Sequence, residues 1–88
     1  MNEMADLMIE IKSIVERLSE IIDDGSVPKN VRTHIQKIIL SLKDGNELSI
    51  NVNKALNQLD ELSSDVNIQS YTRTQIWNVV STLEKLHK

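Results

Sequence analysis

The sequence predicts an all-α protein: an antiparallel up-and-down four-helix bundle built from two similar helical hairpins. Its 88 residues include 2 Gly, 1 Pro and 2% aromatic residues, whereas 40% of them are hydrophobic. This composition is typical of helices with aliphatic cores, because β-sheets use more turn-forming and aromatic residues. Apolar residues also recur at steps of three and four in four segments. Finally, the second half of the chain repeats the first.

The first helix is expected over residues 3–23, where apolar residues form a broad stripe. The stripe consists of Met4, Leu7, Met8, Ile11, Ile14, Val15, Leu18, Ile21 and Ile22. The segment DDGSVP ends this helix, since Gly25 suits a left-handed cap and Pro28 cannot lie inside a helix. Met1, Met4 and Met8 extend the stripe toward its free end, where methionines fill core gaps or form an adaptable docking surface.

Three further helices follow. The second begins near Pro28 and ends before residues 44–46, with the stripe Val31, Ile35, Ile38, Ile39 and Leu42. Asn46 is expected to cap the third helix, residues 47–64, whose stripe is Leu48, Val52, Ala55, Leu56, Leu59 and Leu62. Ser70 is expected to cap the fourth helix, whose stripe is Ile76, Val79, Val80, Leu83 and Leu86. Connections of about two to six residues favour antiparallel neighbours, which predicts the bundle.

A shift of 41 residues aligns the two halves of the chain without a gap. Apolar positions match, as expected for two amphipathic hairpins, but polar positions around the turn match as well. The polar matches are Asp24 with Asp65, Arg32 with Arg73 and Thr33 with Thr74. We therefore predict two hairpin repeats, at about residues 3–44 and 46–87, inside a single domain spanning residues 1–88. One hairpin cannot bury its stripe alone, whereas two facing hairpins can.

Each predicted hairpin turn carries an acid and, eight residues later, an arginine: Asp24 and Arg32 in the first, Asp65 and Arg73 in the second. We interpret each pair as a structural clasp, in which the carboxylate accepts hydrogen bonds from the guanidinium group. Glu20 and Glu61 are alternative acceptors. In the competing interpretation, the two arginines form an anion-binding or partner-binding site.

Three segments carry a resemblance to a known family: SVPKNVR, LDELSSD and, most specifically, TRTQIWNVVSTLE at residues 72–84. Through them the chain resembles uncharacterised protein family 0147, a family of small archaeal proteins, over nearly its whole length. The resemblance implies a compact helical bundle of archaeal, cytoplasmic origin, and it transfers no functional residues. The chain departs from the family at Gln69, where members often have Pro, and this weakens the repeat at that point.

Several functional classes are disfavoured by composition. The net charge of −3 lacks the basic excess that nucleic-acid binders usually carry. With no cysteine, disulfides and thiolate metal ligands are excluded. The N-terminal segment MNEMADLMIEIK fits neither a signal peptide nor a transmembrane helix, so a soluble cytoplasmic protein with no membrane contact is expected.

The residues that could do chemistry are few. Two glycines cannot build a Gly-rich phosphate loop. His34 and His87 are the only histidines. The segment EKLH (84–87) has the carboxylate–histidine spacing of di-metal bundles, but such a site needs the motif twice. We therefore predict no catalytic residues, no metal, no cofactor and no small-molecule substrate, and the protein is not expected to be an enzyme.

Trp77 is the only tryptophan, and it lies off the main apolar stripe at the position equivalent to Gln36. It is either an interface anchor or a lid over the core. The leading hypothesis is a non-enzymatic protein–protein interaction module, capable of self-association, whose interface involves Trp77, Arg32 and Arg73. The alternative is a nucleic-acid or ribonucleoprotein accessory factor that uses the basic residues of the second helix, Lys29, Arg32, Lys37 and Lys43.

Overall fold

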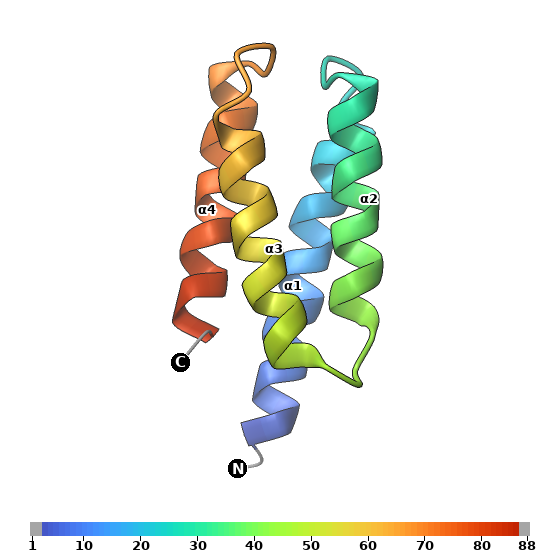
Figure 1. Cartoon of the computed structure of the whole chain (residues 1–88), viewed down its shortest axis with the longest axis vertical. Helices are drawn as coiled ribbons and strands as arrows, with labels where there is room; N and C mark the ends of the chain where they lie inside the picture. The colour runs from blue at the N-terminus through green and yellow to red at the C-terminus, as the bar shows by residue number, and fades with distance from the viewer. Residues whose placement is uncertain (1–2, 87–88) are drawn as a thin grey trace.

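The computed structural model describes the backbone of residues 3–86 and the side chains of residues 6–86. This part of the chain contains four α-helices and no β-strand: α1 (Glu3–Asp23), α2 (Lys29–Lys43), α3 (Leu48–Ser63) and α4 (Ser70–Leu86). The helices lie along the long axis of an elongated molecule measuring 41 × 19 × 19 Å. The α1–α2 and α3–α4 turns lie at one end, and the α2–α3 connection lies at the other (Figure 1).

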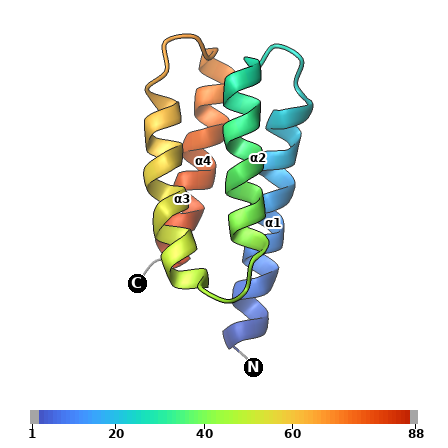
Figure 2. The ribbon, with the colours of Figure 1, turned by 45° about the vertical axis from the view of Figure 1, so that its right-hand side comes forward.

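The helices pack side by side around one core. Helix α1 packs against α2 and α4, and α3 also packs against α2 and α4 (Figure 2). Leu18, Ile35, Leu59 and Ile76, one residue from each helix, are fully buried. Burying a side chain of this size contributes about 1.5–3 kcal/mol. The apolar stripes therefore supply the core, because each helix turns its stripe toward the other three.

The core also includes residues outside the stripes. Val27 and Ile68, at equivalent places in the two hairpin turns, are buried. Thr72, at the position equivalent to Val31, is also buried. The turns thus close the end of the core with an apolar residue each, which ties both turns to the helices beneath them.

The ends of the helices differ from the sequence prediction at three positions. Gly25 does not have a positive φ, so it is not a left-handed cap. Asn46 does not cap α3; its backbone N–H donates to Asp44 Oδ1 at 3.1 Å. Ser70 is the first residue of α4 and not its cap, because the Arg73 N–H already donates to the Gln69 carbonyl at 3.0 Å.

Met8 also differs from the prediction. Its side chain is 62% exposed, although it belongs to the apolar stripe expected for α1. It borders a surface depression that is also lined by Leu42 of α2 and Leu48 of α3. Met4 lies outside the described side chains, and Met1 lies outside the described residues.

Candidate functional site

The two hairpin turns are closed by equivalent aspartates. The Asp24 carboxylate accepts hydrogen bonds from the backbone N–H and the hydroxyl of Ser26, at 2.9 and 2.8 Å. The Asp65 carboxylate accepts the backbone N–H of Asn67 at 2.8 Å. Aspartate is favoured in such turns because its side chain satisfies a main-chain N–H two residues later. These hydrogen bonds account for the alignment of the two aspartates in the sequence.

The hydrogen bonds of the first turn change the acidity of Asp24. The backbone N–H of Ser26, and then its hydroxyl, stabilise the carboxylate and lower the pKa of Asp24. We expect a carboxyl titration followed by NMR to show the Asp24 midpoint below the ordinary aspartate value. Because the folded pKa is the lower one, Asp24 stabilises the protein above the unfolded pKa of about 4. That contribution is lost as the pH falls through the folded pKa.

The control for this prediction is Ser26→Ala, which removes the hydroxyl but keeps the backbone N–H. The pKa of Asp24 should then rise part of the way toward its ordinary value. A midpoint in the unaltered protein at or above the ordinary aspartate value would contradict the hydrogen-bonded geometry of this turn.

Arg73 joins the start of α4 to the end of α3. Its Nε donates to the Ser63 carbonyl oxygen at 2.8 Å, and its Nη2 donates to the Asp65 carbonyl oxygen at 3.0 Å. These carbonyls lie at and just beyond the C-terminus of α3, where the last carbonyls of a helix lack intrahelical partners. A cation is also favourable there because of the helix dipole.

This geometry corrects the predicted clasp. Arg73 does span the turn to Asp65, but its acceptors are main-chain carbonyls and not the carboxylate. The Asp65 carboxylate is already engaged by Asn67 within the turn. None of the hydrogen bonds among residues 6–86 joins either arginine to Glu20 or Glu61.

Arg32 behaves differently from Arg73, although the two are equivalent in sequence. Its Nε is buried and has no hydrogen-bond partner among the described residues. The hydrogen bonds among residues 6–86 also include none between Asp24 and Arg32, and the Asp24 carboxylate accepts its hydrogen bonds from Ser26. The structure thus separates the two arginines: Arg73 has a clear structural role, and Arg32 has no equivalent bond.

Trp77 lies one helical turn after Arg73, on the same side of α4. Its side chain is 53% exposed, while its sequence-equivalent residue Gln36 is also exposed. The indole therefore does not cover the core as a buried lid. Large exposed aromatic side chains are frequent anchors of protein interfaces.

The two histidines are candidate metal ligands in the sequence, although no metal site is predicted from it. His34 is half-buried on α2, and His87 lies outside the described residues. Among the residues that the structure describes, no group of three His, Cys, Asp or Glu side chains is placed to hold a metal ion. Asn51 donates its Nδ2 to the Ser41 carbonyl at 3.0 Å and so links α3 to α2.

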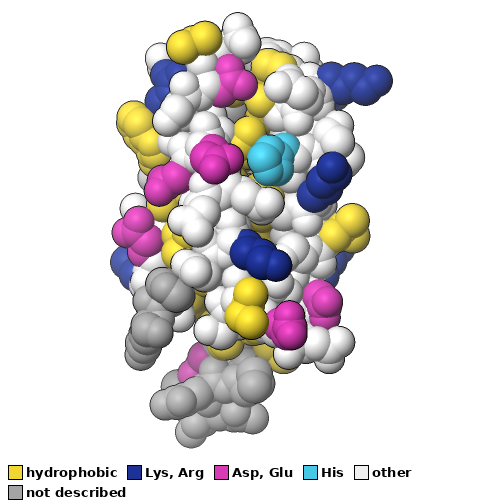
Figure 3. Space-filling view, viewed as in Figure 1, with side chains coloured by type: hydrophobic (Ala, Val, Ile, Leu, Met, Phe, Trp, Pro, Cys, Tyr) yellow, Lys and Arg dark blue, Asp and Glu magenta, His cyan; other side chains and the backbone are white. Residues whose placement is uncertain are grey.

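The surface of the described residues includes two depressions of similar volume. The first has a volume of about 510 Å³ and lies beside the N-terminal half of α1. Its apolar lining residues are Met8, Ile11 and Val15 of α1, Leu42 of α2 and Leu48 of α3. The second, about 530 Å³, is polar and is lined by Arg17 and Glu20 of α1 and by Gln75, Asn78, Ser81 and Thr82 of α4. The face formed by α2 and α3 shows acidic, basic and hydrophobic side chains interspersed (Figure 3).

Within the described residues, no helix is both long and apolar enough to cross a membrane.

Over the described residues, these features define a small all-α protein of four helices with an exposed tryptophan and an apolar groove beside α1. A sequence model described as "Uncharacterised protein family (UPF0147)" matches residues 1–86. The chain is 42% identical to the UPF0147 protein MJ1419 of Methanocaldococcus jannaschii, covering 86% of this chain and 83% of that protein. It is 36% identical to a UPF0147 protein of Sulfurisphaera tokodaii, covering 96% of both chains.

A solved structure is also similar to this chain in fold and sequence. The crystal structure of the unknown function protein MMP1188 matches with a TM-score of 0.81 and 36% identity, over 90% of this chain and 91% of that one. The chain belongs to the uncharacterised protein family UPF0147. The family has no assigned function, and the Methanocaldococcus and Sulfurisphaera relatives are both archaeal proteins.

Proposed function

We propose that this protein is a non-enzymatic protein–protein interaction module that acts in the cytoplasm and uses α4 as its contact surface. The observation that supports this proposal is the 53% exposure of Trp77. An indole buried on binding contributes a large contact area at low entropic cost, and tryptophan is enriched among binding hot spots. Arg73 holds the first turn of α4 against α3, so the indole projects from a helix that is fixed at that end.

The architecture proposed with this function is an antiparallel up-and-down bundle of two equivalent hairpins, related by the 41-residue shift. It is supported by the two turns, where the N–H groups of Val27 and Ile68 donate to the carbonyls of Asp24 and Asp65, at 3.1 and 3.4 Å. Equivalent substitutions in the two hairpins test this architecture, because they should cost the same free energy of unfolding.

The interaction proposal predicts that Trp77→Gln abolishes partner capture. Gln is chosen because Gln36 occupies the equivalent exposed position in the first hairpin. We expect affinity purification from a lysate of the source organism, with quantitative mass spectrometry, to recover protein partners that fall at least about tenfold with this variant. The recovery should be the same with and without nuclease.

A matched control lies on the same helix. Tyr71 is 67% exposed, and its equivalent residue is Asn30, so Tyr71→Asn removes an exposed aromatic residue from a different side of α4. Partners should survive this variant. Partners that are retained by Trp77→Gln, or lost equally with Tyr71→Asn, would contradict a specific role for Trp77.

A nucleic-acid accessory role is the second candidate, and it is supported by α2. This helix carries Lys29, Arg32, Lys37 and Lys43 and no acidic residue. Phosphate contacts by these residues would make binding fall steeply with salt. Partners that disappear on nuclease treatment would favour this candidate over the interaction module.

A further inference from the structure

The side of the bundle formed by α1 and α2, termed the α1/α2 face, carries two exposed apolar side chains at positions where the second hairpin has serine. Met8 is 62% exposed and borders the apolar groove, and Leu40 is 69% exposed. Leu40 shares a side of α2 with Lys43, which also lines the groove. The equivalent residues of Met8 and Leu40 in the second hairpin are Ser49 and Ser81. An apolar groove with an exposed apolar rim is typical of an interaction surface.

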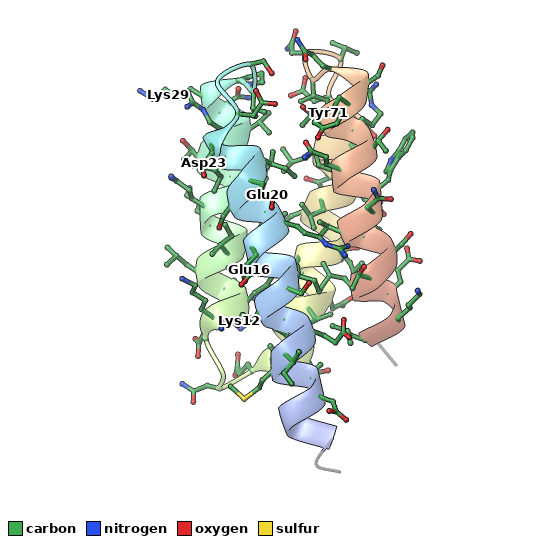
Figure 4. All side chains as sticks on the ribbon, turned by 180° about the vertical axis from the view of Figure 1, so that it is seen from behind. Lys12, Glu16, Glu20, Asp23, Lys29 and Tyr71 are labelled. Atoms are coloured by element: carbon green, nitrogen blue, oxygen red, sulfur yellow. The ribbon has the colours of Figure 1, made fainter. Side chains whose placement is uncertain are left out.

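The two helices of this face have opposite charges. Helix α1 contains six acidic and two basic residues, a net charge of −4. Helix α2 contains four basic residues and no acid, a net charge of +4 without its histidine. Lys12, Glu16 and Glu20 follow one another along α1, and Lys29 stands at the start of α2 (Figure 4). None of the side-chain hydrogen bonds among residues 6–86 joins an acid of α1 to a base of α2.

We propose that a second copy of this chain covers the α1/α2 face in a two-fold symmetric dimer. A two-fold axis parallel to the long axis of the bundle places α1 of each copy over α2 of the other. Each acidic helix then meets a basic helix, and the same contact is made twice, as an isologous interface requires. The paired helices run in opposite directions, so their dipoles also attract.

The apolar groove lies within this contact, and Met8 and Leu40 are removed from water when the second copy binds. Neither residue belongs to the buried core of the single chain. The inference rests on the proposed role in protein–protein interaction. Its contact surface is formed by α1 and α2, however, and does not include Trp77 of α4.

The test is sedimentation equilibrium of the purified, nuclease-treated chain over a range of concentrations. We expect a species of twice the 10.0 kDa monomer mass that weakens in about 0.5 M NaCl. The double variant Met8→Ser, Leu40→Ser should raise the dissociation constant at least about tenfold. Circular dichroism should show unchanged helix content, because both residues are exposed.

The charge contribution has a matched control. Lys43→Glu should weaken the dimer, whereas Lys54→Glu, on α3, makes the same change in net charge and should leave it intact. A chain that remains monomeric at all concentrations would overturn the proposal. So would a dimer that survives the serine variants but is lost with Trp77→Gln, which would place self-association on α4 and keep the interaction module. A higher-mass species that is present before nuclease treatment and absent after it would also overturn the proposal, and it would favour nucleic acid bound to α2.

Discussion

Leu18→Ala and Leu59→Ala should each lower the free energy of unfolding by about 2–5 kcal/mol. Both leucines are completely buried, and they are equivalent under the 41-residue shift. Each substitution removes apolar contacts and leaves a cavity that the surrounding side chains fill only in part. The total stability of a small domain is about 5–15 kcal/mol, so either variant should lose a large part of it.

Urea denaturation followed by circular dichroism measures both losses. The control is Ile50→Ala, which truncates an isoleucine of α3 that is 51% exposed and should change stability by less than about 0.5 kcal/mol. Losses for Leu18 and Leu59 that agree within about 1 kcal/mol would support two equivalent hairpins. A loss at one site only would show that the two hairpins do not contribute alike to the core.

Arg73→Ala should lower the free energy of unfolding by about 1.5–3 kcal/mol, because it removes two hydrogen bonds from a charged donor. The Ser63 carbonyl would then lose its hydrogen bond from Arg73, and the Asp65 carbonyl would keep only its hydrogen bond from the Ile68 N–H. Arg32→Ala should cost clearly less, since the Arg32 Nε has no partner to lose. Arg73→Lys should be intermediate, because an ammonium group cannot reproduce the fork of the guanidinium group.

A double-mutant cycle separates this arrangement from a carboxylate clasp. Asp65→Asn keeps an acceptor for the Asn67 N–H but removes the charge. If Arg73 binds main-chain carbonyls, the coupling between Arg73→Ala and Asp65→Asn should be less than about 0.5 kcal/mol. A coupling of several times that size would restore the carboxylate as the acceptor. Equal losses for Arg32→Ala and Arg73→Ala would contradict the difference between the two hairpins.

The turns illustrate how far sequence reasoning reaches at a candidate site. The equivalence of Asp24 and Asp65 is visible in the sequence, and so is the spacing to Arg32 and Arg73. The acceptors of the arginine are not visible, because the choice between a carboxylate and a carbonyl depends on where the folded turn places each group. The bond of Asn51 is hidden for the same reason: a polar residue on a helix gives no sign that it reaches a carbonyl on the next helix.

The sequence alone determined the four helices and, for most of their length, the side that each one buries. Helix periodicity is a local property, because apolar residues recur every three or four positions along one segment. It also determined the family, through segments such as TRTQIWNVVSTLE. Only the tertiary structure decided that Met8 and Trp77 are exposed and that Arg73 binds main-chain carbonyls. Exposure and hydrogen-bond partners depend on which helices end beside a residue and what they present there, and that information is spread over the whole chain.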